Sequence, residues 1–484
     1  MKAPQPLRIG WASCDVTPDR PANLRGQFHA RVSESVNDPL TATALALESA
    51  DGEQAVMVSL DAVGINDPVR DGCRARIAER IPDLAPEKLF ISATHTHTAP
   101  DQAPTQYPRQ REGVMTDEEY SALLVERISE AIVAAWNARE PGAVAWGLGW
   151  AAVGFNRRMS YLDGHATMYG AADDEQFSHV EGADDHSVAV LATYDEAGGL
   201  TGVVVNLACP SQCVESCRFV SADFWHDARQ ELRKRNGEHL HVLAQCSAAG
   251  DQSPHLQLHR PAQVRMLELR GLTAPDDGVA VETWMRGEIA RRIADAVDDV
   301  LECAPSDIRR EVVFAHETAT LDLPMRRVTE SDAAYCREQA KLHAKALEAY
   351  ADPDPADAAY SRDFRRARYF QKVLDRFESQ GGNPTLPMET HIIRLGDIAF
   401  ATNRFELFLD FGHRIKARSK AVQTFVVQLT GEGTYLPTER AVQAKSYGAG
   451  IESNLVGPTG GQVLVEETLK IINGLFSDSA GEDA

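Results

Sequence analysis

The sequence has few cysteines, no long apolar run and an excess of acidic residues. No segment offers the roughly 18 consecutive apolar residues of a membrane-spanning helix, and the N-terminal residues lack the apolar core of a secretion signal. We therefore expect a cytoplasmic protein with no transmembrane segment. Eight cysteines in 484 residues are too few for a disulfide scaffold. The formal net charge of −22 argues against a nucleic-acid or anionic-membrane partner.

What the sequence does have is an alternation of strand and helix signals in its N-terminal half. Apolar, strand-like runs are separated by helical periods, of which 116–137 opens with a capping box. This alternation predicts an α/β fold with a mixed, largely parallel sheet and flanking helices. Residues 329–380 are long, charged and helical, with a break at 351–357, and predict a helical insertion. Because no linker divides the chain, we expect one domain over 1–484.

The segment ISATHTHTAP (91–100) places two histidines just beyond a strand-like run. Residues i and i+2 of a strand face the same side, so His95 and His97 can meet one ion or one substrate. Sites in open α/β sheets gather beyond the carboxyl ends of strands, where this pair falls. Although a lone histidine is usually structural, two at this spacing between threonines predict a metal site.

The segment 206–226 offers a further ligand for such a site. It follows an apolar strand and ends at the start of a predicted helix, with Cys209 and His226 as the two candidates. Cys213 and Cys217 are read as bystanders, because the paired CxxC pattern of structural zinc sites is absent.

Three later segments contain polar residues in unusual surroundings. Ser247 follows a strand and is a candidate nucleophile or oxyanion contact, although the G-x-S-x-G elbow of serine hydrolases is missing. Glu406 lies in the apolar run FELFLDF, read as a helix start, where an acid is costly unless it is paired or binds metal. Tyr435 and Tyr447 lie in glycine-rich loops, where tyrosines commonly pack or anchor the backbone.

Taken in order, these segments resemble the neutral (non-lysosomal) ceramidases in their N-terminal catalytic domain. The shared pieces run along nearly the whole chain: CDVTP (14–18), NDPLTATALAL (37–47), VSLDAVGI (58–65), ISATHTHTAP (91–100), GFNRR (154–158), AQCSAAGDQSP (244–254), FELF (405–408) and YLPT…Y (435–447). The resemblance implies one ceramidase-like catalytic domain and a zinc amidase that splits an N-acyl bond. It places zinc ligands at His95, Glu406 and Tyr435.

The same resemblance assigns the groups that contact substrate. His97 falls where the family has a histidine that contacts substrate and the reacting water. Arg157, Ser247 and Tyr447 match its active-site arginine, serine and second tyrosine.

The sequence departs from the family pattern in two places. Pro210 stands where the family has another zinc-ligand histidine, so we expect His226, or as second choice Cys209, to replace it. No segment matches the family's C-terminal immunoglobulin-like domain, so a divergent member without that domain is expected.

The resulting hypothesis is a zinc-dependent hydrolase that cleaves an amide bond of a small-molecule substrate, an N-acyl compound or lipid-like amide, with metal-activated water. Three alternatives stay open: an ester or carbohydrate-derived substrate on the same metal scaffold, a non-catalytic binding relative, and a metal-independent amidase using Ser247. A homo-oligomer is compatible with this reading.

Overall fold

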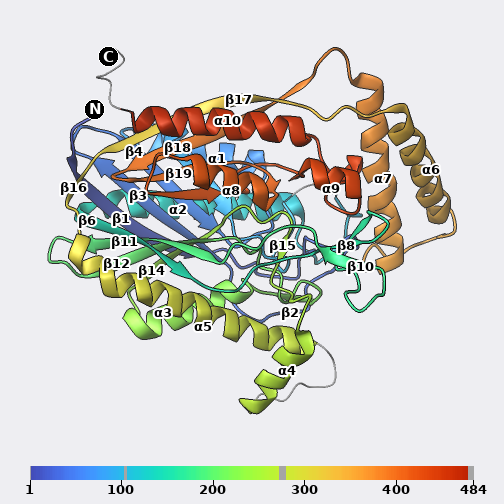
Figure 1. Cartoon of the computed structure of the whole chain (residues 1–484), viewed down its shortest axis with the longest axis horizontal. Coiled ribbons are helices and arrows are strands. Elements are labelled where there is room, and N and C mark those ends of the chain that lie inside the picture. Colours follow the sequence, from blue (N-terminus) through green and yellow to red (C-terminus); the bar gives the residue numbers. More distant parts are fainter. Residues whose placement is uncertain (1, 103–105, 272–278, 478–484) are drawn as a thin grey trace.

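The computed structural model describes residues 2–102, 106–271 and 279–477, and its core is two stacked β-sheets between two layers of helices (Figure 1). The main sheet has the strand order β14-β12-β11-β6-β1-β3-β4-β5. The strands in this order are β1 (Gln5–Asp15), β3 (Thr41–Ser49), β4 (Gln54–Leu60), β5 (Leu89–Ala93), β6 (Glu140–Trp150), β11 (Ser187–Asp195), β12 (Leu200–Leu207) and β14 (His241–Cys246), and the short β16 (Glu311–Val312) also pairs with β1.

The predicted mixed α/β architecture is confirmed, but the main sheet is largely antiparallel where the sequence indicated parallel pairing. Parallel pairing in this sheet is found for β4 with β5 and for β12 with β14. The reason is local: β3–β4 and β11–β12 are joined by tight turns containing Gly52 and Gly198, both with positive φ. A short turn between neighbouring strands reverses the chain and forces antiparallel pairing.

The second sheet has the order β17-β18-β19-β21, with β17 (Phe314–Pro324), β18 (Thr385–Leu395), β19 (Ile398–Thr402) and β21 (Gln423–Val427). Its last pair, β19 with β21, is parallel. The two sheets pack face to face through buried side chains such as Leu45, Phe314 and the stacked Phe400 and Phe425 rings. Ala44, one residue from Leu45, packs on the helical side instead, as the period-two geometry of a strand requires.

Helices cover the outer faces of both sheets. α1 (Asp67–Arg80) and α2 (Asp117–Asn137) pack on one half of the main sheet, and α3 (Phe224–Asn236) and α5 (Val279–Cys303) on the other. α8 (Leu409–Arg418) and α10 (Pro458–Leu475) cover the second sheet. α2 begins at the predicted capping box, in which Thr116 and Glu119 bond each other's backbone N–H.

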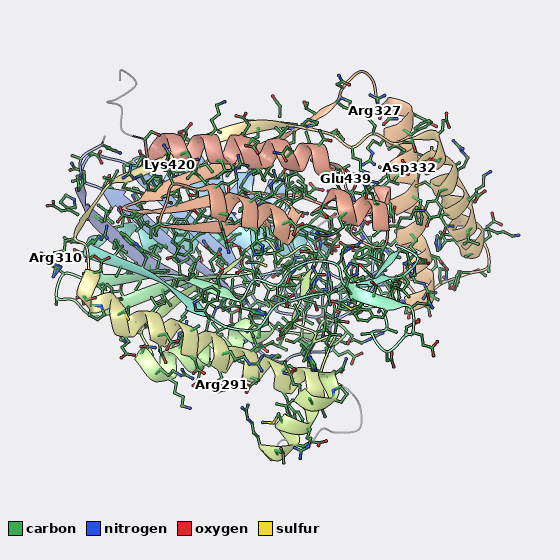
Figure 2. All side chains as sticks on the ribbon, viewed as in Figure 1. Arg291, Arg310, Arg327, Asp332, Lys420 and Glu439 are labelled. Atoms are coloured by element: carbon green, nitrogen blue, oxygen red, sulfur yellow. The ribbon has the colours of Figure 1, made fainter. Side chains whose placement is uncertain are left out.

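The predicted helical insertion is confirmed as a hairpin of α6 (Glu330–Leu347) and α7 (Ala358–Ser379), seen at one end of the molecule in Figure 1. Asp357 caps α7 after the predicted break. Smaller helices are α4 (Arg260–Leu269) and α9 (Glu439–Ala444). Charged side chains such as Arg291, Arg310 and Lys420 lie exposed at the surface (Figure 2). Within the described ranges, no helix combines the length and the apolar character needed to cross a membrane.

Candidate active site

The candidate site is assembled from loops that follow the parallel strand pairs. The loop after β5 carries the two predicted histidines and is tied to the loop after β12, because the backbone N–H and hydroxyl of Ser211 both donate to Thr94 O, at 3.3 and 2.8 Å. The loop after β14 is tied back to β12, because Ser247 N donates to Leu207 O at 2.9 Å. Parallel strands end at the same sheet edge, which is why segments so distant in sequence meet here.

His95 is held in a strained backbone conformation, with φ of 67°. Residues other than glycine rarely adopt this left-handed region, and such strain is common at functional sites. Its Nδ1 lies 2.5 Å from Val63 O and therefore carries a proton. Its Nε2 faces Glu406 Oε2 at 3.3 Å. Two hydrogen-bond acceptors oppose each other unless a proton or a metal cation lies between them.

Glu406 and Tyr435 are neighbours because two very short strands pair in parallel. β20 (Glu406–Leu407) and β22 (Tyr435–Leu436) put the two residues in direct register. This corrects the reading of Glu406 as part of a helix start, since α8 begins only at Leu409. Burial acts to raise the pKa of Glu406, but the charge of His95 and hydrogen bonding to His95 and Tyr435 lower it to about 2. Glu406 is therefore a carboxylate at neutral pH.

Arg157 connects Tyr435 to the loop after β14. It lies between β7 (Phe155–Asn156) and β8 (Arg158–Tyr161), and its Nη2 donates to Tyr435 Oη at 3.1 Å and to Gly250 O at 3.0 Å. The ring of Tyr447 lies edge-on to that of Tyr435, with centroids 5.3 Å apart. The predicted Arg157, Tyr435 and Tyr447 are thus brought together beside Glu406.

His97 lies against His95, with ring centroids 5.0 Å apart, but has different partners. The side-chain nitrogen of Gln212 is 2.7 Å from His97 Nε2. An amide N–H can only donate, so Nε2 accepts and the proton of the neutral ring is on Nδ1. Nδ1 lies 3.2 Å from Glu215 Oε2, although the two are not aligned for a good hydrogen bond. Burial, opposed by Glu215, lowers the pKa of His97 to about 4, so the ring is neutral at pH 7.

The loop that carries His97 is held by buried contacts. Arg31 donates to His97 O at 2.6 Å and to Cys217 O at 2.7 Å. Gly26, at φ of 117°, packs so closely that a Cβ there would meet the His97 ring at 2.4 Å. The imidazole is therefore fixed in place by packing as well as by hydrogen bonds.

Sequence reasoning missed three polar residues of this site. Gln212 and Glu215 lie in the segment whose cysteines drew attention instead, and His255 follows the Ser247 loop. Glu215 lies between His97 and His255: its Oε2 is near His97, and its Oε1 is 3.4 Å from His255 Nε2. Their only sequence signal is their position in loops that follow parallel strands, which does not distinguish them from the other loop residues.

Other predicted residues lie elsewhere or have no partner in the cluster. Ser247 is fully buried, and its hydroxyl has no hydrogen-bond partner among the described residues. Cys209 is buried in the core and its thiol lies 3.3 Å from Val153 O. His226 lies on α3 next to Asp227, which pairs with Arg286 of α5 at 2.9 Å.

The donors fit part of a metal site. His95 Nε2, the Glu406 carboxylate and the Tyr435 hydroxyl have the chemistry of zinc ligands. Over the described ranges, however, no three His, Cys, Asp or Glu side chains are grouped to hold a metal. The structure therefore does not bring His226 or Cys209 to His95 and Glu406 as a replacement for the histidine missing at Pro210. The fit is limited to three donors, one of them a tyrosine.

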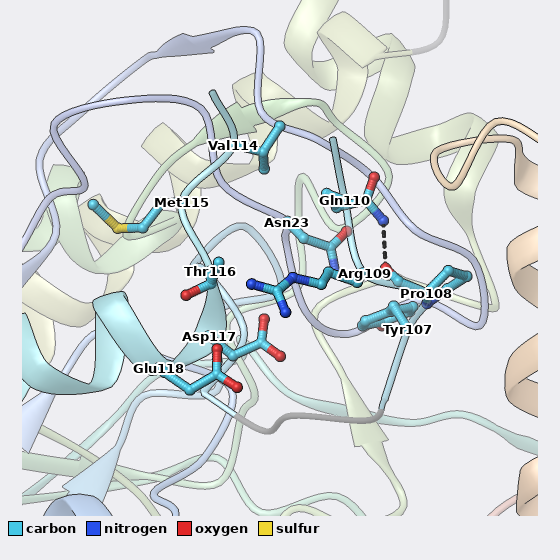
Figure 3. Close-up of a pocket in the computed structure, with 10 residues that line it drawn as sticks. All are labelled: Asn23, Tyr107, Pro108, Arg109, Gln110, Val114, Met115, Thr116, Asp117 and Glu118. Atoms are coloured by element: carbon cyan, nitrogen blue, oxygen red, sulfur yellow. Dashed lines mark hydrogen bonds between the residues drawn. The ribbon is translucent and has the colours of Figure 1, made fainter. Parts of the chain in front are cut away.

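A cavity of about 450 Å³ is lined in part by Glu406, Tyr435 and Tyr447. A neighbouring cavity of about 710 Å³ shares Tyr369, Tyr447 and Glu452 with it. The much smaller cavity of about 110 Å³ in Figure 3, lined by residues such as Arg109 and Asp117, contains none of the predicted site residues. Substrate access therefore fits the two larger cavities between α7 and the site.

The comparisons with known proteins bear on the fold of the chain. No family model matches the sequence, and no curated protein matches it either. Among solved structures, the neutral ceramidase from Pseudomonas aeruginosa is similar with a TM-score of 0.68 at 19% identity, over 99% of this chain and 76% of that one. A structure described as ceramidase complexed with C2 gives a TM-score of 0.66 at 17% identity, over 99% and 77%. The resemblance predicted from the motifs is thus confirmed at the level of the fold.

Proposed function

We propose that the protein is a hydrolase that cleaves an amide bond, adding water to give a carboxylic acid and an amine. The observation that carries this proposal is the convergence of His95, Glu406, Tyr435 and Arg157, of which Glu406 and Tyr435 line a cavity. The ceramidase fold supports it, although a fold by itself does not fix a reaction. Four groups from distant segments, one of them on a strained backbone, are more than a core needs for stability.

Zinc is the proposed cofactor, with His95, Glu406 and Tyr435 as the residues that would hold it. The support is that His95 Nε2 and Glu406 Oε2, both atoms that can bind a metal, face each other at 3.3 Å, where a cation can take the place of a proton between them. A bound divalent cation would polarise the scissile carbonyl and make water a better nucleophile.

The other residues would bind the substrate and move the proton. Arg157 is a fixed cation beside Tyr435, and with Tyr447 it can stabilise negative charge as it develops on the carbonyl oxygen. His97 is neutral at pH 7 and can accept a proton from the attacking water and return it to the leaving nitrogen. Glu215 positions His97 and stabilises the protonated ring. Ser247 is proposed as a further substrate contact.

The test combines metal analysis with a hydrolysis screen of N-acyl amides. We expect about one zinc per chain, amidase activity that is lost on chelation, and rescue by zinc. Metal-free protein that stays inactive after zinc is added would contradict the proposal and favour the non-catalytic relative. Activity that resists chelation would favour a metal-independent amidase using Ser247.

A further inference from the structure

One wall of the cavity beside the candidate site is formed by basic side chains of α7. These side chains, here called the basic wall, follow the spacing of a single helix face: Arg365, Arg368, Lys372 and Arg376. The same cavity is also lined by Glu406, Tyr435 and Tyr447. The basic wall therefore shares one cavity with groups that we propose for catalysis.

The basic wall is not neutralised by carboxylates. In the part of the chain that the structure describes, none of its four members forms an ion pair with Asp or Glu, whereas Arg25 and Arg404, which line the same cavity, are 3.7 Å from Asp101 and 3.3 Å from Asp67. Arg365 donates to Tyr107 Oη at 2.9 Å.

The guanidinium groups of the wall also keep unused donors. Arg376 donates to the carbonyls of Asn454 and Ile451, at 2.9 and 3.0 Å. The Nε atoms of Arg365 and Arg376 are buried and have no hydrogen-bond partner among the described residues. Because these two atoms are buried, a ligand in the cavity would meet the exposed Arg368 and Lys372 instead.

Such an arrangement is unfavourable in the absence of a ligand. Like charges three or four residues apart on a helix repel each other and destabilise it. The chain has 71 acidic residues and a net charge of −22, so carboxylates are abundant elsewhere. Three acids line this cavity, and one of them, Glu406, faces His95. Glu432 and Glu452 are therefore the two acids that remain to balance the four positive charges of the wall. Positive charge therefore predominates next to the proposed reacting groups.

We propose that the substrate is an amide that carries an anionic group, a carboxylate or a phosphate, which binds to the basic wall. This inference rests on the proposed amide hydrolysis and specifies its substrate class. A neutral lipid amide would leave the four cations without an anionic partner. The neighbouring cavity is lined by Phe28, Tyr335 and Phe370 as well as by charged side chains such as Arg366 and Lys445, and its aromatic rings offer apolar surface to the acyl part of such a molecule.

The experiment compares pairs of amides that differ in charge and little in size. The first pair is N-lauroylglycine and N-lauroylglycinamide, and the second is N-lauroylphosphoethanolamine and N-lauroylethanolamine. We expect the anionic member of one pair to be cleaved with a kcat/KM at least about tenfold higher, and the preference to shrink with added salt, as screened charge attraction requires. The pair that shows the preference identifies carboxylate or phosphate as the group recognised.

Variants then connect the preference to the wall. Arg368→Glu/Lys372→Glu changes two exposed members four residues apart and should lower kcat/KM for the anionic amide by about tenfold or more while leaving the neutral amide within about twofold. The matched control is Arg337→Glu/Lys341→Glu, the same pair of residue types at the same spacing on exposed α6 and outside both cavities. Arg368→Ala/Lys372→Ala, without new acids, should give a smaller effect in the same direction.

The outcomes separate this inference from the proposed function. If neutral and anionic amides are cleaved equally well by wild type and variants, the inference is overturned while the amidase stands. If no amide is cleaved, calorimetry with N-lauroylglycine and N-lauroylglycinamide decides. If N-lauroylglycine binds more tightly than N-lauroylglycinamide, and Arg368→Glu/Lys372→Glu abolishes this difference, an anionic ligand is upheld without hydrolysis. If the two compounds bind equally, or neither binds, the inference is overturned.

Discussion

His95 Nε2 and Glu406 Oε2 face each other at 3.3 Å, although His95 lies in the loop after β5 and Glu406 in β20, far apart in the sequence. Because His95 Nδ1 is already engaged with Val63 O, this pair is the centre on which a cation would act. The first prediction concerns that centre.

Replacing His95 by alanine should remove bound zinc and lower kcat/KM by more than about 100-fold, since even the loss of an outer-shell partner of a metal ligand costs 10–100-fold. Metal content of the purified protein is measured together with activity. His226→Ala is the control: the structure does not bring His226 to Glu406, so this variant should keep its zinc. Full activity of His95→Ala would refute the assignment, and zinc loss in His226→Ala would restore the ligand inferred from the sequence.

Glu215→Gln should lower kcat by about 10- to 100-fold, because general acid–base catalysis depends on a positioned imidazole. Glu215 lies 3.2 Å from His97 Nδ1 and 3.4 Å from His255 Nε2, so its loss leaves the ring without its negative partner. KM should change much less than kcat, since Glu215 positions a group and does not itself bind substrate. Glu196→Gln, in the exposed turn between β11 and β12, serves as the control and should change neither constant.

Gly250→Ala should destabilise the protein by about 1–3 kcal/mol, the usual cost of inserting a methyl group into a packed interior. A Cβ at Gly250 would lie 2.4 Å from Glu406 O, a backbone atom that cannot move without shifting Glu406 itself. Activity should fall along with stability, as followed by chemical denaturation and the amidase assay. In contrast, Gly287→Ala on the exposed face of α5 meets no atom within 4 Å and should be neutral or stabilising. Equal effects of the two substitutions would contradict the packing argument.

Asp185 should make stability depend on pH at the acid end. Burial acts to raise the pKa of Asp185, but Lys416 at 2.7 Å and hydrogen bonds from Ser187 outweigh it and lower the pKa to about 2. Because this pKa is lower in the folded chain than in the unfolded chain, where it is about 3.9, the ionised carboxylate stabilises the fold at pH values above about 3.9. This stabilisation disappears as the pH falls toward 2. Asp185→Asn should therefore cost about 2 kcal/mol at pH 6 and almost nothing near pH 2.

The measurement for Asp185 is urea unfolding at several pH values. Asp352→Asn, an exposed residue between α6 and α7, is the reference and should show no such dependence. A cost for Asp185→Asn that stays constant between pH 2 and pH 6 would disprove the role of its ion pair with Lys416.

The sequence predicts local features, such as helix caps, better than it predicts which strands pair with each other. The capping box at Thr116 and the helical insertion could be found because their signals lie within a few residues. The antiparallel course of the main sheet was not anticipated, because the partner of a strand is set by turns and by packing against the second sheet. The sequence around Glu406 predicts a helix for the same reason: its two-residue strand, β20, is defined by pairing with Tyr435 and Leu436 of β22, which lie far along the chain.

The candidate site divides along similar lines. His95, Glu406, Tyr435, Arg157 and Tyr447 were found from the motifs and do converge. Gln212, Glu215 and His255 were missed, because their importance depends on which loops meet across the sheet edge. The sequence predicts His226 as a ligand because it lies at the start of a helix soon after the loop that carries Pro210. In the structure His226 is not grouped with His95 and Glu406.

The α6–α7 hairpin interrupts a single antiparallel strand pair. β17 and β18 stay in register to their far ends, where Pro324 is opposite Thr385, so the segment between them leaves and re-enters the sheet at one point. Helices attached in this way can be lengthened, replaced or lost over evolution without disturbing the strands beneath. Remodelling this appendage could thus change which molecules the adjoining cavities admit, while the strands and the loops at the sheet edge keep their arrangement.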